Sequence, residues 1–185
     1  MILLFAHVAL AVPAIPPVTD EEKVRLEARE VVVHADITGD VITSVGYVHV
    51  ALPARAVWPA VIDLKARVAE NNQLDIMDEY RRDGPYDWYV KVHMTIFGFP
   101  IGFHNRYLFH PEAEYLSYTL DSLQPNDLVI CDGWWRTETR GAGTLLVYSS
   151  TTEAKGYVPG WIRKWMTVNS MENLLEKMRE RAERR

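Results

Sequence analysis

Residues 156–182 read GYVPGWIRKWMTVNSMENLLEKMRERA, and this stretch decides the fold. Its apolar residues recur at steps of three or four, which is the spacing of one face of an α-helix. They form a single stripe of about six turns, made of Trp161, Trp165, Val168, Met171, Leu175, Met178 and Ala182. The opposite face is charged, so the stretch predicts a long amphipathic helix. Burial of such a stripe requires a large apolar partner elsewhere in the chain.

The sequence upstream predicts that partner as a long antiparallel sheet. Stretches with apolar residues at every second position are separated by turn residues, as in the amphipathic stretch 88–97. They predict six successive strands at 74–81, 88–97, 101–109, 114–122, 128–139 and 144–153. Two more strands, 31–37 and 41–52, precede a pair of short helices near 57–64 and 65–72. We therefore expect an α+β domain in which the last helix packs on a meander.

Composition narrows the class of protein. The chain has 185 residues, of which 48% are hydrophobic and 24% charged, and these proportions are typical of one globular domain. The formal net charge of −5 argues against nucleic acid as a partner. Cys131 is the single cysteine, so an intrachain disulfide and an all-cysteine zinc site are both excluded.

The N-terminus resembles a secretory signal peptide. Residues 1–14, MILLFAHVALAVPA, form an apolar run that ends in small residues, but no lysine or arginine precedes Lys23. The alternative is a mis-called start codon or an N-terminal segment that packs on the domain. We assign residues 1–18 to this segment and its proline-containing linker, and 19–185 to the domain. The first reading implies an exported or periplasmic protein, and the second a cytoplasmic one.

Three stretches resemble a known superfamily. Residues 48–63, VHVALPARAVWPAVID, are similar to its first strand running into a Val-Trp helix. Residues 143–148, GTLLVY, are similar to its last strand, and 156–162, GYVPGWI, to its proline-containing entry into the final helix. The family is the START-like superfamily, SRPBCC or Bet v 1-like, which includes polyketide cyclases and coenzyme Q-binding proteins. The resemblance implies a helix-grip fold: a curved sheet around the last helix, enclosing an apolar cavity for a lipid, sterol, quinone or polyketide.

Several side chains are predicted to line that cavity. Large aromatic residues and a few polar groups on the strands and the last helix are the side chains expected of such a site. The predicted set is Trp88, Val92, Phe103, Asn105, Tyr107, Trp134, Arg136, Tyr148, Trp161 and Trp165. The sequence does not decide which face of strand 128–136 lines the cavity, because Asp132 and Arg136 could equally form an ion pair on the outer face of the sheet. We expect the tryptophans of the last helix to act as a lid and Met178 to lie far from the ligand.

Two function classes remain open, and a third reading, a lone interaction module, would require the cavity to be filled by the protein's own side chains. The first is non-covalent binding and carriage of a hydrophobic ligand. The second is a cyclase or aromatase whose general acid–base groups would come from Asn105, Tyr107, Asp132, Arg136 and Tyr148. No specific catalytic residue is assigned, and the sequence predicts no cofactor.

A metal site is not expected, because no closely spaced set of histidines and cysteines is present. His93, His104 and His110 are expected at the surface or in turns. Residues 161–185 hold seven basic and four acidic side chains, so transient contact with an anionic membrane surface is a further expectation.

Overall fold

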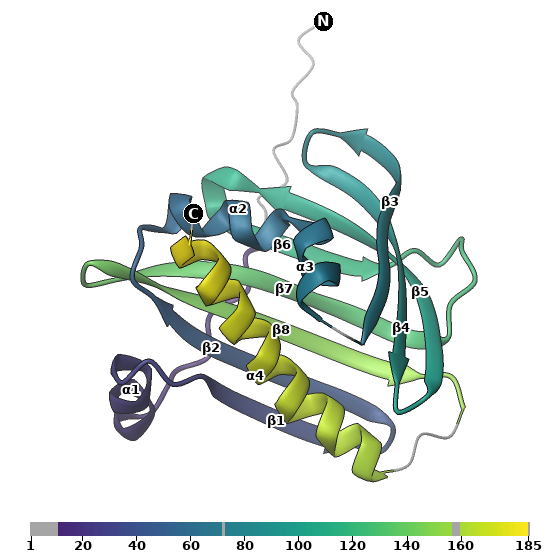
Figure 1. Cartoon of the computed structure of the whole chain (residues 1–185), viewed down its shortest axis with the longest axis horizontal. Coiled ribbons are helices and arrows are strands. Elements are labelled where there is room, and N and C mark those ends of the chain that lie inside the picture. Colours follow the sequence, from purple (N-terminus) through teal and green to yellow (C-terminus); the bar gives the residue numbers. More distant parts are fainter. Residues whose placement is uncertain (1–10, 72, 157–159, 185) are drawn as a thin grey trace, which may run out of the picture.

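A computed structural model of the chain describes the backbone of residues 11–71, 73–156 and 160–184, and the side chains of those residues apart from 160–167. The elements follow the predicted order (Figure 1). They are α1 (Asp20–Glu27), β1 (Val32–Thr38), β2 (Val41–Val50), α2 (Ala54–Ile62), α3 (Leu64–Glu70), β3 (Leu74–Gly84), β4 (Asp87–Ile96), β5 (Phe99–His110), a 3-10 turn (Pro111–Ala113), β6 (Tyr115–Leu120), β7 (Leu128–Arg140), β8 (Gly143–Ala154) and α4 (Gly160–Arg184).

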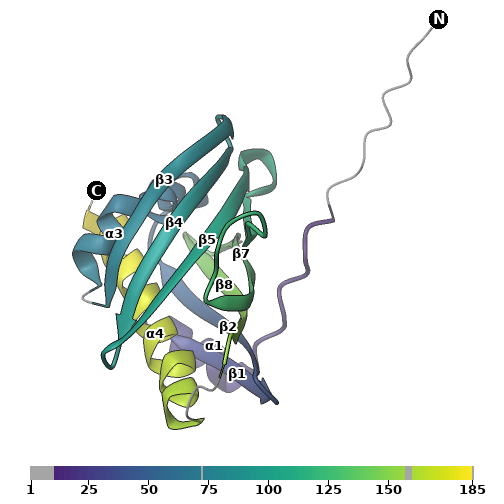
Figure 2. The same cartoon turned by 90° about the vertical axis from the view of Figure 1, so that its right-hand side faces the viewer.

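The strands form one antiparallel sheet in the order β1-β2-β8-β7-β6-β5-β4-β3. Strands β3 to β8 are the predicted meander, and β8 pairs with β2, for example Gly46 opposite Tyr148. The sheet curves strongly, and its concave side holds α4 and the α2–α3 pair (Figures 1 and 2). This is the predicted α+β helix-grip architecture.

Helix α4 rests closely on β2. Gly46 has no side chain at the crossing, and a Cβ atom there would lie 2.5 Å from Leu175 Cδ1 and 2.7 Å from Met171 Sδ. The C-terminal end of α4 is tied to the α2–α3 pair by Arg181. Its guanidinium pairs with Glu70 and donates to the carbonyls of Ala60, at 2.9 Å, and Asp63, at 3.1 Å. Helix α4 therefore lies over the β1–β2 side of the sheet, away from β3 to β5.

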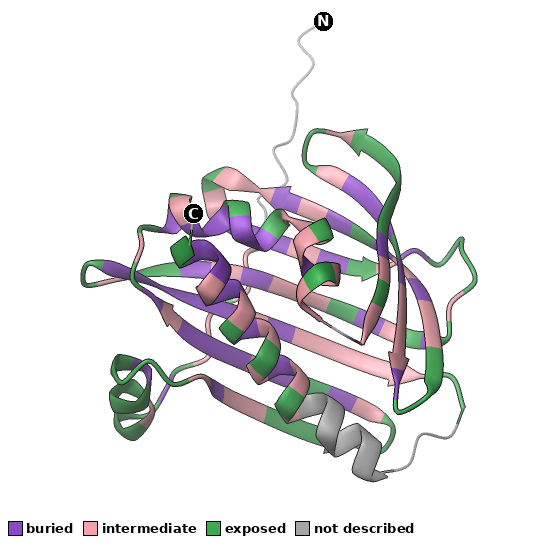
Figure 3. Ribbon diagram, in the orientation of Figure 1, coloured by how far each residue is buried: buried purple, intermediate pink, exposed green. Residues whose placement is uncertain are grey.

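The main core lies between α4 and the sheet, and buried residues of β2, β7 and β8 face it beneath the helix (Figure 3). A second cluster covers the outer face of β1, β2 and β8. There the segment before α1 packs through Val18, and Tyr47 Oη donates a hydrogen bond of 3.2 Å to the carbonyl of Pro16. Residues 13–18 are therefore part of the folded domain, on the side of the sheet away from α4.

Helix α1 begins with a reciprocal pair of hydrogen bonds between Thr19 and Glu22. Thr19 Oγ1 accepts from the backbone N–H of Glu22, and Glu22 accepts from the backbone N–H of Thr19. This reciprocal capping box satisfies two backbone donors that would otherwise be unpaired.

Among the described helices, none has a span long and apolar enough to cross a bilayer.

Candidate functional site

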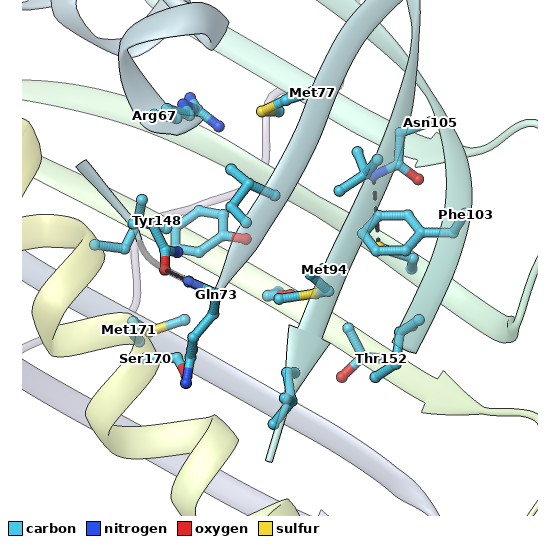
Figure 4. A pocket seen from close by; sticks show the side chains of 18 of the residues that line it. Arg67, Gln73, Met77, Met94, Phe103, Asn105, Tyr148, Thr152, Ser170 and Met171 are labelled. Carbon is cyan, nitrogen blue, oxygen red and sulfur yellow. Dashed lines mark hydrogen bonds between the residues drawn. The ribbon is translucent and has the colours of Figure 1, made fainter. Parts of the chain in front are cut away.

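A cavity of about 790 Å³ lies between α4, α3 and the concave face of the sheet (Figure 4). Apolar side chains dominate its wall. The strands contribute Met77, Val92, Met94, Ile101, Phe103 and Leu128, and α4 contributes Met171, Leu174 and Met178. The volume falls within the range of roughly 300 to 1,000 Å³ that is typical of small-molecule sites. Geometry and wall chemistry together describe a site for an apolar molecule.

Polar residues surround the part of the wall that reaches the surface. Asn71 and Gln73 approach from the connection between α3 and β3, Ser170 and Asn173 from α4, and Asp40 from the β1–β2 turn. Asp40 and Asn173 are exposed to solvent. Gln73 is fixed at this position by the hydrogen bond of 3.0 Å from its backbone N–H to Asn71 Oδ1. The cavity therefore opens between α4 and the start of β3.

Away from this opening, hydroxyl, amide and thiol groups from four strands converge. Tyr118 Oη lies 2.7 Å from Tyr148 Oη and donates to Ser150 Oγ at 3.0 Å. Asn105 Nδ2 donates to Cys131 Sγ at 3.5 Å, while Asn105 Oδ1 is buried without a partner among the described residues. The tyrosine rings form a continuous row. The ring centroids of Tyr107 and Tyr118 are 5.5 Å apart, and those of Tyr118 and Tyr148 are 6.2 Å apart.

A glycine makes this arrangement possible. Gly133 pairs with Tyr118 on β6 and with Ser150 on β8. A Cβ atom at Gly133 would collide with the backbone oxygen of Ser149 and with Tyr118 Oη. Glycine inside a strand often marks such a close approach. The absence of a side chain allows the ring of Tyr118 to cross β7 and reach Tyr148.

Gly133→Ala is therefore expected to destabilise the fold and displace Tyr118. The methyl group meets a backbone atom that cannot rotate away, and overpacking of this kind costs about 1–3 kcal/mol. Urea denaturation measures the loss. Gly102→Ala is the matched control on β5, because its Cβ atom would meet Asp127 Oδ2 at an ordinary 3.6 Å. Equal stability of the two variants would contradict this account of Gly133.

Arg67 of α3 brings a buried positive charge to the cavity. Its side chain borders the cavity wall, and only 7% of the residue is exposed. The guanidinium lies 5.1 Å from the centre of the Trp135 ring and donates through Nη2 to the carbonyl of Val61. Nε is buried without a partner, and none of the described carboxylates forms an ion pair with Arg67. Burial lowers the pKa of this guanidinium, yet an arginine side chain remains charged in proteins.

The other titratable groups of this region are held neutral. Burial raises the pKa of the phenols of Tyr107, Tyr118 and Tyr148 above the ordinary range, and it raises the pKa of the Cys131 thiol to about 12. These groups are thus protonated at neutral pH. They can donate and accept hydrogen bonds, but they do not supply negative charge opposite Arg67.

The structure brings half of the sequence-predicted site residues together. Val92, Phe103, Asn105, Tyr107 and Tyr148 all line the cavity. Trp88 is buried in the core, where its ring stacks on Tyr107 with 6.2 Å between centroids, one layer behind the wall. The side chains of Trp161 and Trp165 lie outside the described residues, so the predicted lid does too.

Two predicted residues lie on the opposite side of the sheet. Trp134 packs against the outer cluster, and Arg136 donates to the carbonyl of Pro13 in the N-terminal segment. Asp132 is exposed as well, and it accepts a hydrogen bond from Thr119 rather than pairing with Arg136. The inward residues of β7 are instead Leu128, Cys131 and Trp135. A register shift between Leu128 and Ile130 changes the alternation, so even-numbered positions are inward before it and odd-numbered ones after it.

Sequence reasoning missed Arg67, Met77, Tyr118 and Trp135 as cavity residues. The period-two alternation of strands would predict Tyr118 and Trp135 as cavity residues if one inward-facing position on β6 and one on β7 were known. Arg67 lies in a stretch read simply as polar, where nothing distinguishes it from other surface residues. The expectation for Met178 was wrong, because it lines the cavity although it sits far along α4.

His93, His104 and His110 each have separate surroundings. His93 Nδ1 lies 3.0 Å from Asp75 Oδ2 at the surface, and His104 Nδ1 lies 3.0 Å from the carbonyl of Pro125. His110 stacks on Tyr115 and keeps a buried Nε2 without a partner in the described structure. Within the described residues, no group of three or more His, Cys, Asp or Glu side chains is placed to hold a metal ion.

The fold is that of the START-like superfamily, as the sequence predicted. A STAR-related lipid transfer protein from Xanthomonas axonopodis superposes with a TM-score of 0.68 at 13% identity, covering 83% of this chain and 93% of that one. The Zhui aromatase/cyclase from Streptomyces sp. R1128 gives 0.62 at 21% identity, over 78% and 95%. A START superfamily protein from Mycobacterium smegmatis gives 0.63 at 20% identity, over 77% and 97%. No protein-family model and no curated protein sequence matches the chain.

Proposed function

We propose that this protein binds a hydrophobic small molecule in the cavity between α4 and the sheet and carries it non-covalently. The cavity of about 790 Å³ with its largely apolar wall is the observation that carries the proposal. Transfer of an apolar ligand out of water is favourable by roughly 25 cal/mol per Å² buried. The structural neighbours include lipid transfer proteins and aromatase/cyclases, and these names support a hydrophobic ligand such as a lipid or a polyketide-like molecule.

The experiment is native mass spectrometry of protein purified without detergent, followed by extraction with organic solvent. The expected result is a mass above that of the chain, which falls to the chain mass when the ligand is extracted. The stripped protein should then bind the neutral apolar dye Nile red. A chain that is purified empty and binds no Nile red would count against the proposal.

A cyclase or aromatase remains the second candidate. The observation in its favour is the convergence of Arg67, Asn105 and Tyr148 on one cavity. The chemistry of the described wall favours binding over acid–base catalysis, since burial raises the pKa of Tyr148 and so makes its phenol a weak proton donor, and Glu70 is engaged by Arg181. Conversion of the extracted ligand to a product of different mass by the purified protein would establish the enzymatic function instead.

Export is a separate proposal, and the composition of residues 1–14 supports it. Cleavage after Ala14 would keep Pro16 and Val18, which pack on the outer face of the sheet, and would remove Pro13, whose carbonyl accepts from Arg136. The mass of the mature protein recovered from its native source tests this. A mass equal to that of residues 15–185 supports the proposal, and a mass that includes residues 1–14 contradicts it.

A further inference from the structure

Two buried arginines border the cavity, and of these two only Arg181 has a carboxylate partner among the described residues. Arg181 is 4% exposed and pairs with Glu70, and its Nη1 also donates to the carbonyls of Ala60 and Asp63. Arg67 is 7% exposed and, within the described structure, donates one hydrogen bond, to the carbonyl of Val61. Arg181 is therefore satisfied by the fold itself, while the charge of Arg67 is not balanced by any described carboxylate.

Glu70 does not provide this balance. Its carboxylate is shared between Arg181 and Arg184, with Arg184 Nη2 at 3.3 Å. The other acidic residue of the wall, Asp40, lies at the exposed β1–β2 turn, on a different part of the wall. Arg67, Lys177 and Arg181 outnumber Asp40 and Glu70 among the charged residues of the described wall. The cavity therefore has an excess of positive charge, although the chain as a whole is acidic.

A buried, unpaired cation is costly, because it has lost water and gained no anion in return. The face of Trp135 offsets part of this cost through a cation–π contact. The hydroxyl groups of the cavity remain neutral and do not neutralise Arg67. A ligand that carries an anion would complete the site, and a carboxylate matches a guanidinium in both charge and planar shape.

We propose that the ligand is an amphipathic carboxylate whose anionic head lies at Arg67 and whose apolar body lies along the wall toward Thr152 and Ser170. This inference rests on the proposed function and adds the chemical class of the ligand. Figure 4 shows the required arrangement, with Arg67 at one end of the cavity and Thr152, Met171 and Ser170 toward the other. Phe103 and Met94 lie between these ends and offer apolar surface to the body of the ligand.

The test compares two fluorescent probes that differ only in charge, cis-parinaric acid and its methyl ester. The wild-type protein should bind the acid more tightly than the ester. Arg67→Met should weaken binding of the acid by about tenfold to a hundredfold, as expected for loss of a hydrogen bond to a charged group. Binding of the ester should change by less than about threefold, because apolar burial is retained. Arg67→Lys keeps the charge and should retain part of the preference for the acid.

Stability measurements separate this role from a structural one. Arg67→Met should unfold at the same urea concentration as wild type or at a higher one, because it removes an unpaired buried charge. Arg181→Met is the matched control, and it should unfold at lower urea because it leaves Glu70 without its buried partner. If the ester binds as tightly as the acid, or Arg67→Met weakens both probes equally, the inference is wrong and the proposed function stands. If the wild-type protein binds neither probe, both are contradicted.

Discussion

Trp135→Ala is expected to lower the free energy of unfolding by about 3–5 kcal/mol, the loss typical of a fully buried tryptophan. Trp135 is 1% exposed, and its ring stacks on Tyr148 with 4.1 Å between centroids and 18° between planes. It also forms the face on which Arg67 rests. Removing the indole therefore leaves a hole at the junction of β7, β8 and α3. Urea denaturation followed by circular dichroism measures the change.

Trp134→Ala is the control, because it removes the same side chain from the adjacent position on the other face of β7. Trp134 is only partly buried and packs at the edge of the outer cluster. It should cost clearly less stability than Trp135→Ala and leave Nile red binding unchanged. An equal loss of stability in the two variants, or a loss of Nile red binding in Trp134→Ala alone, would contradict the orientation of β7.

The same pair of residues shows how far the sequence could be read. Period-two alternation predicts that β7 is a strand with two faces. The alternation is the same whichever face is buried, so it does not say which face lines the cavity. The aromatic and charged side chains of Trp134 and Arg136 favour their own face as the cavity wall, which is the wrong face. The register shift near Leu128 then determined the outcome, since it moves the inward positions from even to odd numbers. A bulge depends on pairing with β8 and has no clear signature in β7 alone.

The fold was more predictable than the site because it depends on sums over many residues. The stripe of α4 and the alternation of β3 to β8 each use more than five positions, so one ambiguous residue changes little. The site depends on single side chains whose neighbours come from distant parts of the sequence. Arg67 lies next to Trp135 only because α3, which follows β2 and precedes β3 in the chain, folds over the concave face of the sheet. No pattern within residues 64–70 indicates that contact.

The existence of the cavity follows from where α4 is held. Gly46 permits close approach of the helix to β2, and Arg181 ties its end to the α2–α3 pair. The curved sheet carries β3 to β5 away from this line of contact (Figure 2). Side chains such as Met77 and Phe103 project into the space without reaching across it. The apolar surface left uncovered is what a hydrophobic ligand would bury.

Thr152→Trp is expected to remove ligand binding while the domain still folds. Thr152 lies on β8 and lines the cavity, so an indole at this position occupies the space that the ligand needs (Figure 4). Nile red affinity should fall by at least about a hundredfold, equivalent to roughly 2.7 kcal/mol of lost binding free energy. The loss of stability should be small, because the added bulk enters a cavity rather than a close-packed core.

Thr151→Trp provides the matched control, since adjacent residues of a strand point to opposite faces of the sheet. Thr151 pairs with Thr43 and with Asp132, both exposed on the outer face. The same indole placed there should leave Nile red binding within about twofold of wild type, because it adds no volume to the cavity. Nile red titration of both variants, with circular dichroism to confirm that each is folded, decides the matter. Full binding by a folded Thr152→Trp variant would place the ligand outside this cavity, and loss of binding in both variants would show that the effect is not local.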